Sequence, residues 1–165
     1  HQPLPPGPPG LAVYGLYSSR EVQRRCQQAG LGLQPALTWK TRVAQVKVIP
    51  AGATAGYGAT FVARRPTRLA LLPVGYADGY DRRWSNSATV LVRGHHAPVV
   101  GRVSMDLLTV DVTGITGVQL DDEAVLLGAQ GRETVTADHL AEIAGTISYE
   151  VITRLSATIE RRLVA

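Results

Sequence analysis

Four short stretches of the sequence place tyrosine, arginine or methionine where the chain is expected to turn. The first is Gly56-Tyr57-Gly58, in which one phenol stands between two glycines. Strand interiors disfavour glycine, because it has no side chain to pack and loses the most backbone entropy on folding. Glycine pairs mostly mark turns and bulges, so this stretch is either a turn with an incidental tyrosine or a turn that presents a functional hydroxyl.

The second stretch, GYADGY at residues 75–80, follows an apolar strand-like segment and precedes Arg82 and Arg83. Its Asp-Gly pair suits the positive φ angles of a tight turn. A turn alone does not explain why two tyrosines and two arginines fall within eight residues. Since binding groups gather on loops, Tyr76 and Arg82 are candidate binding residues.

The third stretch, VGRVSMD at residues 100–106, brings Arg102, Met105 and Asp106 to the end of an expected strand. The structural alternative is a gap-filling methionine with an ion pair between Arg102 and Asp106 or across the strands. Arginine's planar fork suits carboxylates and phosphates, so a small anionic ligand is a second interpretation.

The fourth stretch, TISYEV at residues 146–151, places Tyr149 in the first turn of an expected helix. The free N–H groups and the dipole at that end of a helix favour an anion such as phosphate. A tyrosine that only packs against its neighbours explains the same pattern.

Composition narrows the class of partner. The formal net charge is +4, and Lys40 and Lys47 are the only lysines, so arginine carries nearly all of the positive charge. The basic residues occur in scattered pairs, without a run of five and without interleaved aromatics, which argues against a nucleic-acid surface. The single cysteine, Cys26, excludes an internal disulfide framework and a cysteine-based zinc site, and no metal is expected. No apolar run reaches the length of a membrane span, so we expect a cytoplasmic protein without membrane contact.

The elements that must position these residues are short and mostly β. A Pro-rich start, a strand at 11–17 and a helix over 18–30 form a connecting segment, residues 1–35. From residue 36 to 165 the sequence predicts a mainly β domain, in which strands of 4–10 residues alternate with Gly, Pro, Asn and Asp. Segments expected to form strands include 37–49, 61–65, 68–74, 88–94, 97–105, 107–112, 118–128 and the tail 157–165; two short helices are expected near 137–144 and after Ser148. This pattern predicts a partly open, β-barrel-like fold with a few short helices.

The order of the four stretches is more specific than any one of them. GYGATF, GYADGYDRR, APVVGRVSMD and TISYEV, in this order, resemble the C-terminal domain of the alanine racemases, pyridoxal-phosphate enzymes that interconvert L- and D-alanine. LAVYGL at residues 11–16 is similar to the segment that joins the family's N-terminal (β/α)₈ barrel to that domain. The resemblance runs from about Gly10 to Arg162.

The resemblance implies a catalytic role for Tyr57, as one of two acid/base residues that exchange the α-proton of alanine from opposite faces. A phenol has a reference pKa of about 10, so this chemistry requires nearby positive charge or hydrogen bonds. The resemblance further implies that Met105 and Asp106 meet the substrate carboxylate. Other residues match the family's substrate corridor: Tyr76, Arg82, Arg102 and Ile147. Three match contacts to the cofactor phosphate: Tyr149, Gly10 and Leu11.

The family's site is composite, so the resemblance implies two partners. One is the N-terminal barrel domain, which carries the Schiff-base lysine, and the other is a head-to-tail homodimer partner whose cofactor Tyr57 would serve. Neither Lys40 nor Lys47 has the sequence context of that lysine, and Pro8 stands where the family has an arginine that bonds the pyridine nitrogen. We therefore expect this chain alone to be inactive.

Two alternatives to alanine racemisation stay open at this point. One is a racemase of the same family that acts on another small amino acid such as serine. The other is a non-catalytic β-barrel interaction module, which would have no need of this set of tyrosines, arginine and methionine.

Overall fold

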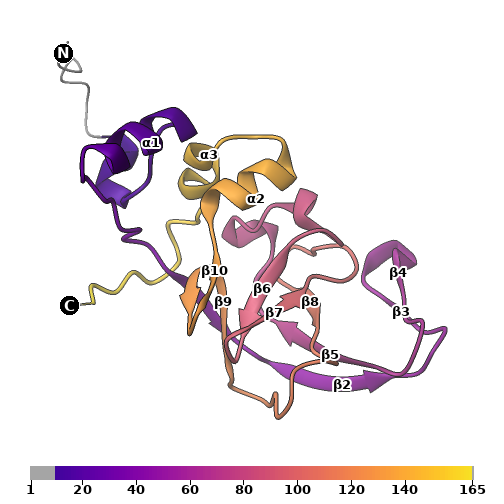
Figure 1. Ribbon diagram of the computed structural model, residues 1–165. Helices are drawn as coiled ribbons and strands as arrows, with labels where there is room; N and C mark the ends of the chain where they lie inside the picture. Colours follow the sequence, from indigo (N-terminus) through magenta and orange to yellow (C-terminus); the bar gives the residue numbers. More distant parts are fainter. Residues whose placement is uncertain (1–9, 165) are drawn as a thin grey trace. The chain divides into compact units, whose positions relative to one another are not determined.

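The computed structural model describes residues 10–164, and Figure 1 shows the order of its elements. The chain divides into two compact units, with the boundary between Thr38 and Trp39. The functional division expected after residue 35 stays a prediction. Within the described residues no helix is long and apolar enough to cross a membrane.

The N-terminal unit contains a 3₁₀ helix, Gly10–Tyr14, and one α-helix, α1 (Arg20–Gln28). The strand expected at 11–17 is therefore wrong, because Gly10 and Gly15 take positive φ angles that turn the chain. The helix is confirmed: Ser19 is its N-cap, and the Ser19 hydroxyl accepts a hydrogen bond from the N–H of Val22 at 3.2 Å. Pro8 lies outside the described residues.

The second unit is built from three antiparallel sheets. The largest contains β1 (Trp39–Arg42), β9 (Glu123–Gln130), β6 (Thr89–Val92) and β7 (His95–Pro98), with β10 (Glu133–Val135) paired to β9. The second contains β2 (Gln45–Ile49), β5 (Thr67–Leu72) and β8 (Leu108–Asp111). The third is the hairpin of β3 (Thr54–Ala55) and β4 (Phe61–Val62).

The two larger sheets meet without closing into a full barrel. A single antiparallel bridge between Val99 and Val110 joins the end of β7 to β8. At the other junction the chain passes from β1 to β2, where the Val43 N–H donates to the Asp122 carbonyl and the Ala44 N–H donates to the Leu71 carbonyl. The segment 37–49 is thus two strands in two sheets rather than one. The mainly β, partly open barrel-like fold expected from the sequence is confirmed.

Two helices lie at one end of the strands (Figure 1). The first, α2 (Ala137–Ala144), begins at the N-cap Thr136, whose hydroxyl accepts from the His139 N–H at 3.1 Å, and ends at Gly145 in the left-handed conformation. The second, α3 (Ser148–Thr153), follows after a short turn. Both agree with the sequence prediction. The strand expected over 157–165 is wrong, because residues 157–164 form no strand and most of their side chains are exposed.

Candidate active site

Tyr57 lies in the loop of the β3–β4 hairpin, in a short 3₁₀ turn, Tyr57–Ala59. Three residues of this loop have positive φ: Gly56 at 75°, Gly58 at 73° and Ala59 at 50°. A positive φ is uncommon for alanine and costs conformational energy, so the surrounding structure must hold the loop in place. The Tyr57 side chain is 71% exposed, and its hydroxyl bonds to no described residue.

The β3–β4 hairpin packs against an apolar cluster. Ile49, Ala63, Leu69 and Val100 form its buried part, and Phe61 of β4 packs against it. The N–H of Ala63 donates to the Ala53 carbonyl at 2.8 Å, which extends the pairing beyond the two-residue strands. The loop that carries Tyr57 therefore stands on a packed base.

Glycine at position 56 allows the Tyr57 turn to contact the third of the four sequence motifs, VGRVSMD at residues 100–106. A Cβ on Gly56 would lie 2.7 Å from the backbone nitrogen of Arg102 and 2.9 Å from the Cα of Gly101. Both distances are too short for a carbon atom, so the backbone would have to move. A Cβ on Gly58 would lie 3.0 Å from a guanidinium nitrogen of Arg102. The two glycines therefore let the Tyr57 turn pack directly on Arg102, and this brings a positive charge beside it.

The second and third motifs are joined through their backbones. The Tyr76 N–H donates to the Ser104 carbonyl at 3.0 Å, and the Ala77 N–H donates to the Met105 carbonyl at 3.0 Å. Gly75 packs so closely on Met105 that any side chain there would collide with its backbone. Tyr76 and Met105, both exposed, consequently occupy adjoining segments.

The chain immediately after α3 contacts the second motif. The N–H of Ser156 donates to the Asp78 carbonyl at 3.1 Å, and Gly79, at φ 101°, packs on the backbone of Arg154. Tyr149 and Ile147, at the start of α3, are exposed, and the Tyr149 hydroxyl makes no hydrogen bond with any residue in the described range.

A charged cluster fixes α3 to the loop after GYADGY. Asp81 is only 7% exposed and forms ion pairs with Arg83, at 2.6 Å, and with Arg154. Arg83 also donates to the Ala144 carbonyl at 2.7 Å, and Arg154 lies 3.2 Å from Glu150. Burial by itself raises the pKa of the Asp81 carboxyl, but the hydrogen bonds and charge of Arg83, with the charge of Arg154, lower it below its usual value.

The structure thus brings the four motifs into one chain of contacts, from the Tyr57 turn to VGRVSMD, then GYADGY, then α3. It does not bring every predicted residue into contact. Within residues 10–164, no hydrogen bond, ion pair or ring contact joins Tyr57 to Tyr149, and none joins Arg102 to Asp106. The side chain of Arg82 is exposed and unpaired in the same range. Gly10 and Leu11 belong to the other compact unit.

The sequence prediction missed the residues that tie the motifs together. Asp81, Arg83, Glu150 and Arg154 form the cluster at α3, while Ser85 and Asn86 bond to the third motif: the Val103 N–H donates to the Ser85 hydroxyl at 3.0 Å. Asp81, Arg83 and Glu150 stand inside the recognised stretches, so their position was a usable signal. Nothing in the spacing of Ser85, Asn86 or Arg154 indicated a contact.

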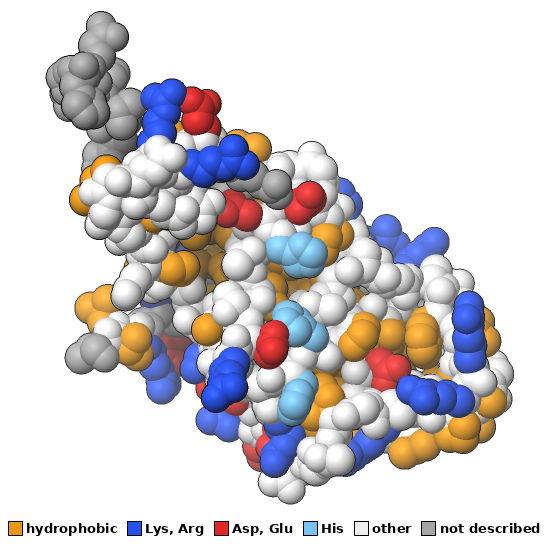
Figure 2. Space-filling model, in the orientation of Figure 1, with side chains coloured by type: hydrophobic (Ala, Val, Ile, Leu, Met, Phe, Trp, Pro, Cys, Tyr) orange, Lys and Arg blue, Asp and Glu red, His pale blue; other side chains and the backbone are white. Residues whose placement is uncertain are grey.

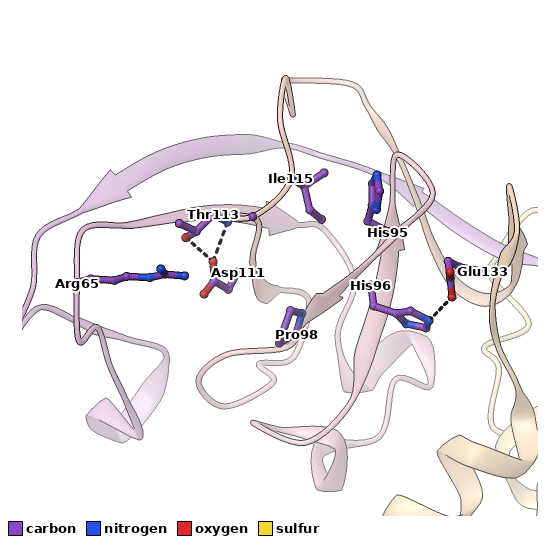
Figure 3. A pocket seen from close by; sticks show the side chains of 9 residues that line it. Arg65, His95, His96, Pro98, Asp111, Thr113, Ile115 and Glu133 are labelled. Carbon is purple, nitrogen blue, oxygen red and sulfur yellow. Dashed lines mark hydrogen bonds and ion pairs between the residues drawn. The ribbon is translucent and has the colours of Figure 1, made fainter.

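A separate hollow of about 420 Å³ lies beside β7 and β8 (Figure 3). Its polar groups largely bond to one another: His96 Nε2 lies 3.1 Å from a Glu133 oxygen, and the Thr113 N–H donates to Asp111 at 2.8 Å. In the space-filling view the histidine side chains lie on the face turned to the viewer, with acidic and basic side chains on either side (Figure 2). None of the residues predicted for the site lines this hollow, and no cluster of metal-ligating side chains occurs among the residues described.

Comparison with known proteins gives one consistent result. A family model described as the C-terminal domain of alanine racemase matches residues 36–163. The alanine racemase of Syntrophobacter fumaroxidans is 51% identical over 143 residues, which cover 87% of this chain and 37% of that protein.

Solved structures agree with this match. The alanine racemase of Bacillus anthracis with bound L-Ala-P has a TM-score of 0.83 at 37% identity, covering 89% of this chain and 36% of that one. The alanine racemase of Bartonella henselae with covalently bound pyridoxal phosphate has a TM-score of 0.72 at 31% identity, covering 88% and 38%. The chain therefore spans less than half the length of the relatives that it matches.

Proposed function

The chain belongs to the alanine racemase family, of which it carries the C-terminal domain, and on this premise we propose that it supplies one side of a racemase site. In this site L- and D-alanine are interconverted with pyridoxal phosphate, and Tyr57 exchanges the α-proton on one face of the substrate. The observation that carries the proposal is the Tyr57 turn: an exposed, unbonded phenol on a loop that its neighbours hold tightly.

The exposure of Tyr57 supports its proposed role as a general acid/base residue. Its hydroxyl is free to reach a substrate proton because no residue in the range 10–164 occupies it. The Arg102 guanidinium packs on the same turn and places a positive charge beside it. When bound, pyridoxal phosphate acidifies the Cα–H of an amino acid, so that a weakly basic group can remove the proton.

The turn after Ser104 is suited to the substrate carboxylate. The N–H groups of Met105 and Asp106 donate to no described residue, whereas the Met105 carbonyl is occupied by Ala77. The bond from Ala77 holds the turn, and its two unbonded N–H groups can both donate to one carboxylate. Arg82 and Arg102, exposed and without acidic partners in the described part of the chain, attract an anionic substrate towards this turn.

The residues present also fit contact with the cofactor, although they do not include its lysine. The free hydroxyl of Tyr149, at the start of α3, would donate to a phosphate oxygen. Lys40 forms an ion pair with Glu123 at 3.1 Å, and it lacks the family context. The proposed role of Gly10 and Leu11 in binding the same phosphate rests on the family resemblance.

The exposed apolar side chains support a composite site. Tyr57, Tyr76, Met105, Ile147 and Tyr149 are all at least two-fifths exposed, and they belong to the segments that form one chain of contacts. Exposed apolar groups of this kind mark interaction or ligand-binding surfaces. We assign this surface to the barrel domain of a head-to-tail homodimer partner, which would supply the Schiff-base lysine and the cofactor. This chain alone then has no racemase activity, and the assembled protein works in the cytoplasm.

The test is Tyr57→Phe in the full-length enzyme, which removes one hydroxyl and no other group. We expect racemisation to slow by about 10²–10⁴-fold, the usual contribution of a general acid/base residue. Tyr80→Phe is the matched control, since Tyr80 is fully buried and away from the exposed surface, and it should retain the normal rate. An unchanged rate for Tyr57→Phe would refute the role assigned to Tyr57.

A further inference from the structure

Asn86 is the sequence's one asparagine, and it lies between the 3₁₀ turn Arg82–Trp84 and β6, outside the four motifs. Its φ is 57°, in the left-handed region. Asparagine enters this region more readily than most residues other than glycine. The backbone at this position therefore favours asparagine, and its side chain makes two bonds that matter to the site.

The Asn86 amide joins two segments that are far apart in sequence. Its Oδ1 accepts a hydrogen bond from the Gly101 N–H at 2.6 Å, and its Nδ2 donates to the Thr60 hydroxyl at 3.1 Å. The orientation of the amide is fixed by chemistry, because a backbone N–H can only donate and so must face the oxygen. A serine or an alanine at position 86 could not make both bonds.

Both bonds lead to the Tyr57 turn. Thr60 is the residue that ends this turn, and Gly101 packs against Gly56, the residue that begins it. Asn86 therefore connects with the entry and the exit of the loop at once. This double attachment accounts for how the loop keeps three positive φ angles while the Tyr57 hydroxyl bonds to none of the described residues.

The same segment holds Arg102. Asn86 fixes the N–H of Gly101, and the neighbouring Ser85 hydroxyl accepts from the N–H of Val103 at 3.0 Å. Arg102 lies between these two anchored amides, and its guanidinium packs on Gly58. One short loop thus sets the separation between the phenol and the charge beside it.

We propose that Asn86 is a positioning residue for the proton exchange assigned to Tyr57. Asn86 touches neither substrate nor cofactor; it acts by holding the Tyr57 turn and the Arg102 segment in register. This inference rests on the proposed function.

The experiment uses the full-length enzyme loaded with pyridoxal phosphate and compares Asn86→Gly with Asp121→Gly. Glycine keeps the positive φ at position 86 and removes both side-chain bonds. Asp121 has φ 66° and is exposed in a turn away from the site, so Asp121→Gly controls for a glycine at such a position. We expect Asn86→Gly to lower kcat about 10–100-fold, the effect of a misplacement of about 1 Å, and Asp121→Gly to leave kcat unchanged.

Two further readouts separate positioning from general damage. In the Tyr57→Phe background, Asn86→Gly should lower kcat no further, because the group that it positions is already gone. By hydrogen–deuterium exchange, residues 56–62 and the amide of Gly101 should exchange faster in Asn86→Gly than in Asp121→Gly. Thr60→Val removes only one of the two bonds and should give an intermediate loss of kcat. This variant replaces Asn86→Gly in the test if Asn86→Gly unfolds.

The failures of the two proposals are distinguishable. If Tyr57→Phe abolishes turnover but Asn86→Gly and Thr60→Val keep the normal kcat, the positioning role is overturned and the proposed function stands. An equal loss from Asn86→Gly in both backgrounds also overturns it. If Tyr57→Phe is fully active, the proposed function fails, and the positioning role fails with it.

Discussion

The two tyrosines of GYADGY show how differently two neighbouring regions of this domain are built. Tyr80 is fully buried; its ring lies 4.7 Å from that of Trp84, edge to face, and 5.9 Å from that of Trp39. Tyr76, four residues earlier, is exposed, as is Tyr57. The buried region satisfies its packing and charge within the chain, whereas the exposed region holds its backbone tightly and leaves its side chains unoccupied.

This difference separates residues that stabilise the fold from residues available for chemistry. Trp84 donates to the Leu140 carbonyl at 2.8 Å, and Asp81 has two arginines. In the exposed region the hydrogen bonds involve the backbone of Tyr76, Ala77 and Gly101, not the side chains predicted for the site. A rigid backbone with free side chains is what a preorganised site needs.

The largest effect expected from breaking the exposed region's backbone is at Gly56. Gly56→Ala places a methyl group against Arg102 and Gly101, so the Tyr57 turn must move. We expect a loss of about 100-fold in the kcat of the full-length enzyme, since a shift of about 1 Å costs this much. Gly52→Ala, also at positive φ in the same region but facing open space, should keep most of the activity; an equal loss would show that glycine flexibility, not the close contact, is what matters.

An intermediate effect is expected on stability when the interior cluster is broken. Asp81→Asn keeps the shape of the side chain and removes its charge, so it weakens the bonds with Arg83 and Arg154. We expect the free energy of unfolding at neutral pH to fall by about 1–3 kcal/mol, as for hydrogen bonds to charged groups. Glu160→Gln, which breaks an exposed ion pair with Arg162, should leave urea unfolding unchanged.

The same variant tests the pH dependence. Because the pKa of Asp81 is lower in the folded state, its charge stabilises the fold above the unfolded pKa of about 3.9. This contribution is lost as pH falls below that value, through the lowered pKa of the folded state. The stability difference between the parent and Asp81→Asn should therefore shrink in acid; a difference that grows there would contradict the assignment.

The smallest effect is expected at Tyr80. Its hydroxyl is buried and bonds to no residue of the described range, and burial raises the pKa of this phenol, so it stays neutral. Tyr80→Phe removes a buried polar atom without a partner and should raise the free energy of unfolding by up to about 1 kcal/mol. A clear loss of stability in urea unfolding would show that the hydroxyl has a partner, such as a bound water.

Much of the fold followed from local sequence, and the reasons for the exceptions are specific. The caps at Thr136 and Gly145 act on adjacent backbone, so both positions could be read directly, whereas the cap of α1 could only be narrowed to Ser18 or Ser19. The alternation in RVAQVKVI predicts strand over the segment 37–49, yet the segment divides at Val43 and Ala44, because these residues bond to two different sheets. Alternation reports burial along a strand and carries no information about which sheet the strand joins.

The candidate site likewise contains residues that the sequence predicted and contacts that it did not. The order of the motifs identified Tyr57, Tyr76, Met105 and Tyr149, and the structure leaves their side chains exposed. The approach of Gly56 to Gly101, 45 positions along the chain, depends on tertiary packing that no local pattern encodes. Asn86 was missed for the same reason, because its two partners lie on either side of it at a distance in sequence.

The central claim is that Tyr57 of one chain serves the cofactor site of another, and mixing two inactive full-length variants tests it most directly. One variant carries Tyr57→Phe, and the other lacks the Schiff-base lysine of its barrel. If the site is composite between chains, hybrid dimers contain one complete site, so racemisation returns at up to about half the parent rate per dimer. If hybrid dimers form and stay as inactive as the separate variants, Tyr57 acts within its own chain and the account is wrong.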